Sequence, residues 1–198
     1  MIYVIARKIV KTFLLIFNNL KVVGEENIPS SAAVVLVANH VSYWDPPVLG
    51  CAIRRKVHFM AKEEVYRVPF LKLLLPYLEC FPVKRGKADR TALRTAFKHL
   101  ENEEIVGIFP EGTRNKGDGL LPFEQGAALI AIKGGASIIP VGLIGTKKAF
   151  PASFRGDIEI RIGKPLRYPE LEGVKLTNDD LARVNMEIIE MIKLLIKK

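Results

Sequence analysis

The segment Asn39–Asp45 holds the clearest candidate for acid–base chemistry, the pair His40 and Asp45. Histidine is the side chain best suited to accept a proton near neutral pH, and a carboxylate that holds one ring nitrogen leaves the other as the base. On a single helix, these two residues would lie about 140° apart and would not meet. At the end of a strand followed by a tight turn, they can face each other. The alternative is that Asp45 only starts a helix before Pro46 and that His40 only ends a strand.

A second candidate cluster is Phe109–Arg114, where polar residues follow an apolar run. Gly112 frees the backbone to approach a ligand, Thr113 offers a hydroxyl, and Arg114 offers a bidentate fork for a phosphate. Glu111 adds a carboxylate to the same segment. The alternative for such a segment taken alone is a turn with a surface salt bridge.

A third candidate is Arg85, which follows the short apolar run Phe81–Val83 and lies in a basic cluster. Its guanidinium can hold a phosphate, whereas Lys84 and Lys87 supply only a general positive field. The alternative is a solvated basic turn.

The other two histidines, His58 and His99, are interpreted as bystanders. His58 falls in a predicted strand with no carboxylate pattern, and His99 falls on a predicted helix. The sequence has no His/Cys spacing typical of zinc and no glycine-rich phosphate loop of the Walker or dinucleotide type. Neither Cys51 nor Cys80 lies in a nucleophile motif. We therefore expect no metal and no resident cofactor.

Apolar, β-branched runs alternate with amphipathic segments, which predicts an α/β fold. Pro140 indicates an edge or an irregular position for its strand. Residues 70–75, between two prolines, are expected to form a broken helix. The three candidate clusters each follow a predicted strand, and ligands of open α/β sheets bind at strand ends. The expected strands are 32–38, 57–61, 81–83, 105–109, 137–143 and 158–162, and the expected helices are 89–102, 126–133 and 179–197.

Length and composition describe a globular chain with a basic excess. Its 198 residues suggest one domain, and its charge of +9 suits a nucleic acid, an anionic membrane or a phosphorylated substrate. The aromatic residues are not interleaved with the basic clusters, which argues against nucleic acid. No apolar stretch is long enough for an ordinary membrane span, and no secretory signal is expected.

The first 20 residues predict a basic amphipathic helix. Arg7, Lys8 and Lys11 fall on one side, and apolar residues such as Ile5 and Ile9 fall on the other. The same helical pattern extends to Asn18, Leu20 and Lys21. Such a helix can lie in a membrane interface or can dock on the core of its own domain.

Together the three clusters resemble the glycerolipid acyltransferase family, the 1-acylglycerol-3-phosphate acyltransferases. The first family motif, Asn-His-x-Ser-x-x-Asp, is present at 39–45, and the third, Phe-Pro-Glu-Gly-Thr-Arg, at 109–114. The second, which ends in an Arg after a short strand, matches 81–85, and the fourth, a Pro within a β-run, matches 138–141. The resemblance covers roughly residues 22–146.

The chain departs from the family pattern at three positions. Glu79 stands where members often have Gly, Asn115 where many have Ser, and Glu124 where many have Lys. These departures affect the expected preference for acceptor and acyl chain.

The resemblance implies acyl transfer from an acyl thioester, carried by acyl carrier protein or coenzyme A, to the sn-2 hydroxyl of lysophosphatidic acid. His40 would act as the base and Asp45 would orient it. Arg85, with Gly112, Thr113 and Arg114, would hold the acceptor phosphate. Glu111 would position Arg114 or a glycerol hydroxyl. The family alternatives are acylation of glycerol-3-phosphate or of another lysophospholipid, and non-catalytic phospholipid binding on the same fold.

The implied architecture is a single α/β acyltransferase domain over 1–198, with a twisted, mostly buried mixed sheet flanked by helices. Residues 1–20 would form the amphipathic membrane-interface helix, 22–146 the motif-bearing core, and 147–198 a C-terminal strand and helix. A lipid acceptor and a basic helix together imply a peripheral protein at the cytoplasmic face of the cell membrane, on an anionic surface.

Overall fold

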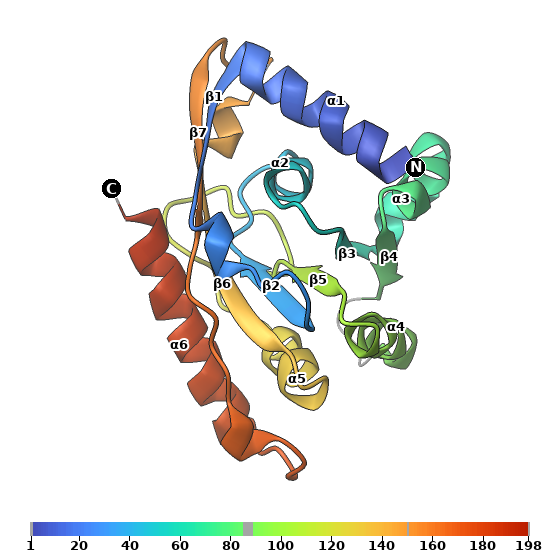
Figure 1. Ribbon diagram of the computed structural model, residues 1–198, viewed down its shortest axis with the longest axis vertical. Coiled ribbons are helices and arrows are strands. Elements are labelled where there is room, and N and C mark those ends of the chain that lie inside the picture. Colours follow the sequence, from blue (N-terminus) through green and yellow to red (C-terminus); the bar gives the residue numbers. More distant parts are fainter. Residues whose placement is uncertain (1, 85–88, 150, 198) are drawn as a thin grey trace.

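The computed structural model describes residues 2–84, 89–149 and 151–197, which form one α/β domain (Figure 1). A seven-stranded mixed sheet has the order β1-β7-β6-β2-β5-β3-β4. The strands from β6 to β4 are parallel to one another, whereas β7 is antiparallel to β6. The predicted fold class is confirmed. The strands are β1 (Asn18–Val23), β2 (Val34–Ala38), β3 (Val57–Lys62), β4 (Cys80–Val83), β5 (Ile105–Ile108), β6 (Ser137–Ile144) and β7 (Gly156–Ile162).

Helices cover both faces of this sheet, with α1 and α2 on one side and α4, α5 and α6 on the other (Figure 1). Strand β2 shows how the sequence produces this layering. Its Val34, Leu36 and Ala38 face the first layer, and Val35 and Val37 face the second, so the strand is buried on both faces as predicted. The helices are α1 (Ile2–Phe17), α2 (Asp45–Ala52), α3 (Pro69–Tyr77), α4 (Arg90–Glu101), α5 (Gly126–Lys133) and α6 (Asn178–Ile196).

Strand β6 lies between β7 and β2, so the edge position suggested by Pro140 is wrong and the irregular one is correct. The carbonyl of Pro140 accepts a hydrogen bond from the Gly163 N–H at 2.8 Å, on the side of β7. The N–H that proline lacks would point to that same side. Strand β7 ends at Ile162, which pairs with Val141, and does not extend to the position opposite Pro140. The missing N–H of Pro140 therefore removes no hydrogen bond between regular parts of the two strands.

The first helix is shorter than predicted, because α1 ends at Phe17 and the chain continues as strand β1. Asn18, Leu20 and Lys21 therefore lie on a strand and not on the helix. Although the sequence pattern favours a helix here, the segment forms a strand because it pairs in parallel with β7, with Leu20 in register with Ile158. The buried Asn18 amide strengthens this pairing by donating to the Gly156 carbonyl at 3.2 Å.

One side of α1 docks on the domain, as the second alternative for this segment proposed. Tyr3 and Leu14 are buried, and the Tyr3 hydroxyl accepts a hydrogen bond from the Val57 N–H at 3.2 Å. Segment 70–75 belongs to one continuous helix, α3, rather than a broken one. Pro69 is its first residue, where proline is tolerated, and Pro76 lies in its last turn, so the helix ends one residue later at Tyr77. Across the described ranges, no helix has the length and hydropathy required to cross a membrane.

Candidate active site

The first and third motifs meet because their strands are neighbours. Strands β2 and β5 are parallel, with Val37 in register with Ile108. Their carboxyl ends therefore deliver His40 and Glu111 to the same edge of the sheet. The loop after β5 also bonds directly to the first motif, since the Asn115 N–H donates to the His40 carbonyl at 2.7 Å.

His40 and Asp45 form a hydrogen-bonded pair, with 2.8 Å between His40 Nδ1 and Asp45 Oδ2. The carboxylate acts as acceptor, so this contact places the proton on Nδ1 and leaves Nε2 as the basic nitrogen. The His40 side chain is 14% exposed and stacks on Phe109, with 4.5 Å between ring centroids. The ring is thus fixed in one orientation while its edge remains accessible.

Asp45 is fully buried, and burying a carboxylate is costly unless it is hydrogen-bonded. Its Oδ2 also accepts from the Val41 and Ser42 N–H groups, at 2.6 and 2.7 Å. Asp45 is the first residue of α2, where the helix dipole stabilises a negative charge. The two interpretations of this residue are therefore both correct, because the residue that opens the helix also holds the histidine.

Glu111 is almost fully buried, and its carboxylate bonds to backbone rather than to the arginine. Oε1 accepts from the His40 N–H at 2.6 Å, and Oε2 accepts from the Leu121 N–H at 3.0 Å. We expected Glu111 to position Arg114 or a glycerol hydroxyl. In the structure, both oxygens of the Glu111 carboxylate bond to backbone N–H groups, one of them that of His40, and the role expected for Glu111 toward the acceptor stays a prediction.

The loop after β5, which bonds to His40, also carries Gly112, Thr113 and Arg114. Gly112 has φ +67°, the left-handed conformation that glycine adopts at little cost, and its N–H closes a turn onto the Phe109 carbonyl at 3.1 Å. Thr113 is exposed. The Arg114 guanidinium lies 3.4 Å from the centroid of the Tyr43 ring, a cation–π contact that orients it. Arg85, the remaining predicted phosphate ligand, lies outside the described residues.

Two asparagines have structural roles that the motif comparison did not assign. The buried Asn39 side chain bonds to both backbone groups of Leu143, donating at 3.0 Å and accepting at 2.7 Å. It thereby fixes the end of β2 against β6. Asn115 accepts from the Gly117 N–H and donates to the Gly119 carbonyl. This Asx turn shapes the loop and gives a local reason for Asn at position 115.

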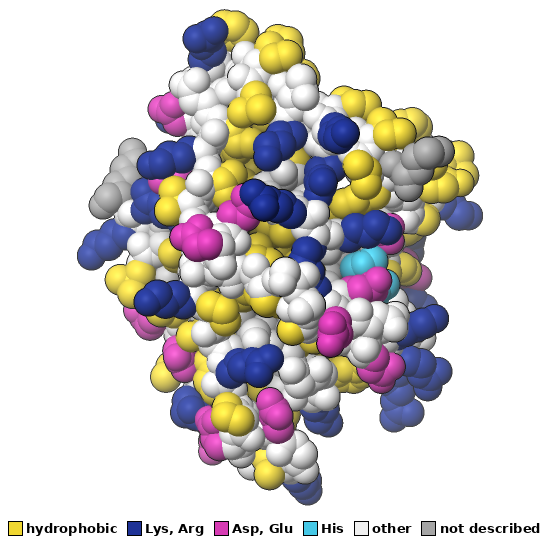
Figure 2. All heavy atoms as spheres, in the orientation of Figure 1, with side chains coloured by type: hydrophobic (Ala, Val, Ile, Leu, Met, Phe, Trp, Pro, Cys, Tyr) yellow, Lys and Arg dark blue, Asp and Glu magenta, His cyan; other side chains and the backbone are white. Residues whose placement is uncertain are grey.

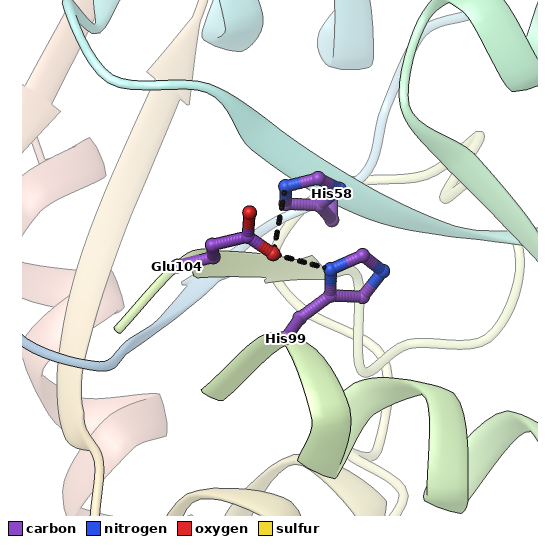
Figure 3. Close-up of side chains that lie close together, drawn as sticks. All are labelled: His58, His99 and Glu104. Carbon is purple, nitrogen blue, oxygen red and sulfur yellow. Dashed lines mark hydrogen bonds and ion pairs between the residues drawn. The ribbon is translucent and has the colours of Figure 1, made fainter. Parts of the chain in front are cut away.

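The cysteines have no features of nucleophiles. Burial raises the pKa of the Cys51 thiol to about 11 and that of Cys80 to about 12, so both stay protonated near neutral pH. The sequence shows no carboxylate pattern near His58, and from the sequence alone His58 and His99 are interpreted as bystanders. Both lie beside Glu104 (Figure 3). Three separate elements bring these residues together, so no local spacing predicts the cluster.

Comparison with known proteins agrees with these motifs. A family model described as Acyltransferase matches residues 19–144. A 1-acyl-sn-glycerol-3-phosphate acyltransferase of Bacillus subtilis (strain 168) is 32% identical over 161 residues, covering 81% of this chain and 80% of that protein. A protein of the same name from Borreliella burgdorferi is 34% identical over 131 residues, covering 65% of this chain and 52% of its own length.

A solved structure supports the fold comparison. The crystal structure of the 1-acyl-sn-glycerophosphate (LPA) acyltransferase PlsC from Thermotoga maritima superposes with a TM-score of 0.75 at 29% identity. The match covers 98% of this chain and 79% of that one. This chain thus spans about four fifths of the Bacillus and Thermotoga proteins and about half of the Borreliella protein.

Proposed function

Because this chain belongs to the acyltransferase family, and is an enzyme of that class, we propose that it acylates 1-acyl-sn-glycerol-3-phosphate to give phosphatidic acid. Relatives named for this reaction support the substrate class. The observation that carries the proposal is the pair His40 and Asp45, with 2.8 Å between Nδ1 and Oδ2. Lipid binding alone needs no general base, so an oriented histidine favours catalysis over simple binding.

In the proposed reaction, Nε2 of His40 takes the proton of the sn-2 hydroxyl as the oxygen attacks the carbonyl carbon of an acyl thioester. The resulting tetrahedral intermediate collapses, the C–S bond breaks, and the imidazolium returns the proton to the leaving thiolate. Asp45 holds the ring and stabilises the imidazolium. The thioester carries the activated acyl group, on acyl carrier protein or coenzyme A, so the transfer uses no resident cofactor or metal.

The acceptor phosphate is assigned to Arg114 and Thr113, together with Arg85. Arg114 has the bidentate geometry that suits a phosphate, and its stacking on Tyr43 reduces the entropy lost on binding. Thr113 offers an exposed hydroxyl next to it. Gly112, with no side chain in a left-handed turn, leaves the backbone of this loop open to the ligand.

The membrane proposal rests on the apolar stripe of α1, formed by Ile2, Ile5, Ile9 and Ile16. These side chains are 46–63% exposed, although Tyr3 and Leu14 of the same helix are buried. Helix α3 adds the exposed Phe70 and Leu73. Figure 2 shows hydrophobic side chains gathered with Lys and Arg over the region where Figure 1 places these two helices.

An exposed apolar stripe beside cations suits an anionic leaflet, with the apolar residues entering the interface and the lysines meeting the headgroups. Lys8 and Lys11 on α1 are exposed and supply such cations. We therefore place the protein peripherally at the cytoplasmic face of the cell membrane, where its lipid acceptor would lie.

An acceptor panel tests the proposed substrate. Lysophosphatidic acid, glycerol-3-phosphate and a lysophospholipid without a free phosphate are offered with one acyl donor, first acyl-CoA and then acyl carrier protein. Phosphatidic acid formed preferentially from lysophosphatidic acid supports the proposal. Faster turnover of either other acceptor assigns the site to that substrate, and lipid binding without turnover by any donor favours a binding protein.

A further inference from the structure

A second cluster of chemically capable side chains lies at the opposite edge of the sheet from His40. His58 is the second residue of β3, Glu104 directly precedes β5, and His99 lies in the last turn of α4 (Figure 3). Strands β3 and β5 are parallel, so their amino ends lie on the same side of the sheet. The acyltransferase motifs follow the carboxyl ends of the strands, on the opposite side. The cluster therefore has no contact with the proposed transfer chemistry.

The geometry converges on one carboxylate oxygen. Glu104 Oε2 lies 2.6 Å from His99 Nδ1 and 3.4 Å from His58 Nε2. The two imidazole rings stack with 3.8 Å between their centroids. One ligand atom from each of the three residues lies within 4.8 Å of the others. Two imidazoles and one carboxylate, contributed by three elements, are thus already arranged around a common point.

We propose that His58, His99 and Glu104 bind one divalent transition-metal ion of the zinc type, which clamps β3, β5 and α4 together. Two imidazole nitrogens and one carboxylate oxygen form a ligand set that Zn²⁺ accepts, with water in the fourth position. Zinc bonds of ~2.0–2.1 Å set tetrahedral ligands about 3.3 Å apart. The 3.4 Å between His58 Nε2 and Glu104 Oε2 already matches this value. A small shift of Glu104 would lengthen its 2.6 Å contact with His99 Nδ1 to the same value.

The surroundings of His58 favour a bound metal ion over a cluster held together by hydrogen bonds alone. His58 is 4% exposed, and within the described residues its Nε2 atom has no hydrogen-bond partner. Buried nitrogen atoms without a hydrogen-bond partner are unusual in proteins, and a bond to a metal ion would give this nitrogen a partner. Glu104 and His99 are 38% and 23% exposed at their side chains, which gives an ion a path from solvent.

Glu79 provides the outer support that ligating histidines commonly have. Its Oε2 lies 3.6 Å from His58 Nδ1, and its Oε1 bonds to Lys56 Nζ at 2.9 Å. A carboxylate behind the second ring nitrogen orients a metal-binding imidazole. The backbone of Glu79 adopts φ +60°, a conformation that favours glycine, so the chain carries this carboxylate at a position of backbone strain.

The test titrates Zn²⁺ into tag-free, chelator-treated protein in competition with a chromophoric chelator. The chain has three histidines, two in this cluster and His40 in the other site, so variants of the two sites can be compared without further histidines to consider. We expect wild type to bind one equivalent with an affinity on the order of 1 μM or tighter. His99→Gln and Glu104→Gln should weaken binding by ~100-fold or more, since even outer-shell changes cost 10–100-fold. His40→Ala, which removes the histidine of the other site, should still bind one equivalent.

Thermal unfolding gives a second readout that does not depend on activity. Saturating Zn²⁺ should raise the Tm of wild type and of His40→Ala but not of His99→Gln. Co²⁺ loaded into wild type should give the intense visible bands of four- or five-coordinate cobalt. No binding by wild type, unchanged binding by His99→Gln, loss of the equivalent in His40→Ala, or a weak octahedral Co²⁺ spectrum would each overturn the proposal.

Discussion

The carboxylate of Glu111 accepts a hydrogen bond from the backbone N–H of His40 at 2.6 Å, across 71 positions of sequence. The third motif therefore fixes the backbone of His40, the residue proposed as the base in the first motif. The second oxygen of Glu111 holds the Leu121 N–H at 3.0 Å, which ties down the far end of the loop that carries Arg114. Glu111 thus links the backbone of His40 to the loop that is proposed to bind the acceptor phosphate.

Glu111→Gln should lower kcat while changing KM for the acceptor little. The amide keeps one acceptor oxygen but turns an NH2 group toward a backbone donor, so one of the two bonds is lost. A displacement of the base by ~1 Å can cost about 10²-fold in rate, and one unsatisfied buried N–H costs about 1–3 kcal/mol of stability. Glu172→Gln, at an exposed position, is the matched control. Normal kcat in Glu111→Gln would show that His40 holds its position without this contact.

Arg114→Ala should raise KM for lysophosphatidic acid by about 10- to 100-fold, because a hydrogen bond to a charged group contributes about 1.5–3 kcal/mol. The kcat should change less, since Arg114 takes no part in the proton transfer of the proposed reaction. Arg183 also lies over a tyrosine, Tyr168, but on α6, so Arg183→Ala is a control for loss of a stacked arginine. A drop in kcat at unchanged KM would contradict the assignment to phosphate binding.

The double substitution Ile5→Ser/Ile9→Ser should weaken partition into anionic vesicles by roughly 100-fold or more, since each of the two isoleucines contributes about 1.5–3 kcal/mol when buried in the membrane interface. The fold should persist, because these side chains are 51% and 63% exposed. Deleting residues 1–20 is a less informative test, since it also removes buried Leu14 and the first part of β1.

Met186→Ser/Leu194→Ser is the matched control for that measurement. It removes two equally exposed apolar side chains from α6, on the other side of the sheet. Vesicle sedimentation compares the two double variants with wild type. Equal partition by the α1 variant and wild type would remove α1 as the membrane contact.

Gly107→Ala should lower the free energy of unfolding by about 1–3 kcal/mol, the usual cost of overpacking a core. Gly107 lies in β5, and a Cβ there would come within 2.6 Å of the Phe59 ring. Phe59 stacks on Phe109, which in turn stacks on His40. Gly126→Ala is the control, because no atom lies within 4 Å of its added Cβ and alanine favours the helix. Denaturant unfolding that gave equal stabilities for the two variants would contradict the packing argument.

Much of the fold was predictable where local patterns agree with tertiary structure. The apolar run of β2 and the cap of α4 are examples: Asp89 accepts from the Thr91 and Ala92 N–H groups, as its position before the helix predicts. Strand β1 was not predictable, since Leu20 and Lys21 continue the helical pattern and only the backbone of β7 selects a strand. Strand β6 itself was predicted, but its interior place in the sheet was not, since Pro140 is tolerable there only because the partner strand β7 ends at Ile162.

The candidate site divides in the same way. His40 and Asp45 lie close in sequence, so the turn between them suffices to predict their contact. The role of Glu111 depends on the adjacency of β2 and β5, which the sequence of either strand does not encode alone. The cluster of His58, His99 and Glu104 requires three elements to be placed together. Local patterns therefore identified the acid–base pair but not the contacts that support it.

In the proposed mechanism, His40 is the base that activates the acceptor hydroxyl. The most direct test compares His40→Ala with wild type, using lysophosphatidic acid vesicles, a long-chain acyl thioester and detection of phosphatidic acid. Circular dichroism and the Tm confirm that the variant is folded. We predict that wild type forms phosphatidic acid and that the variant is slower by about 10²- to 10⁴-fold. Formation of phosphatidic acid by both proteins at similar rates would contradict the mechanism.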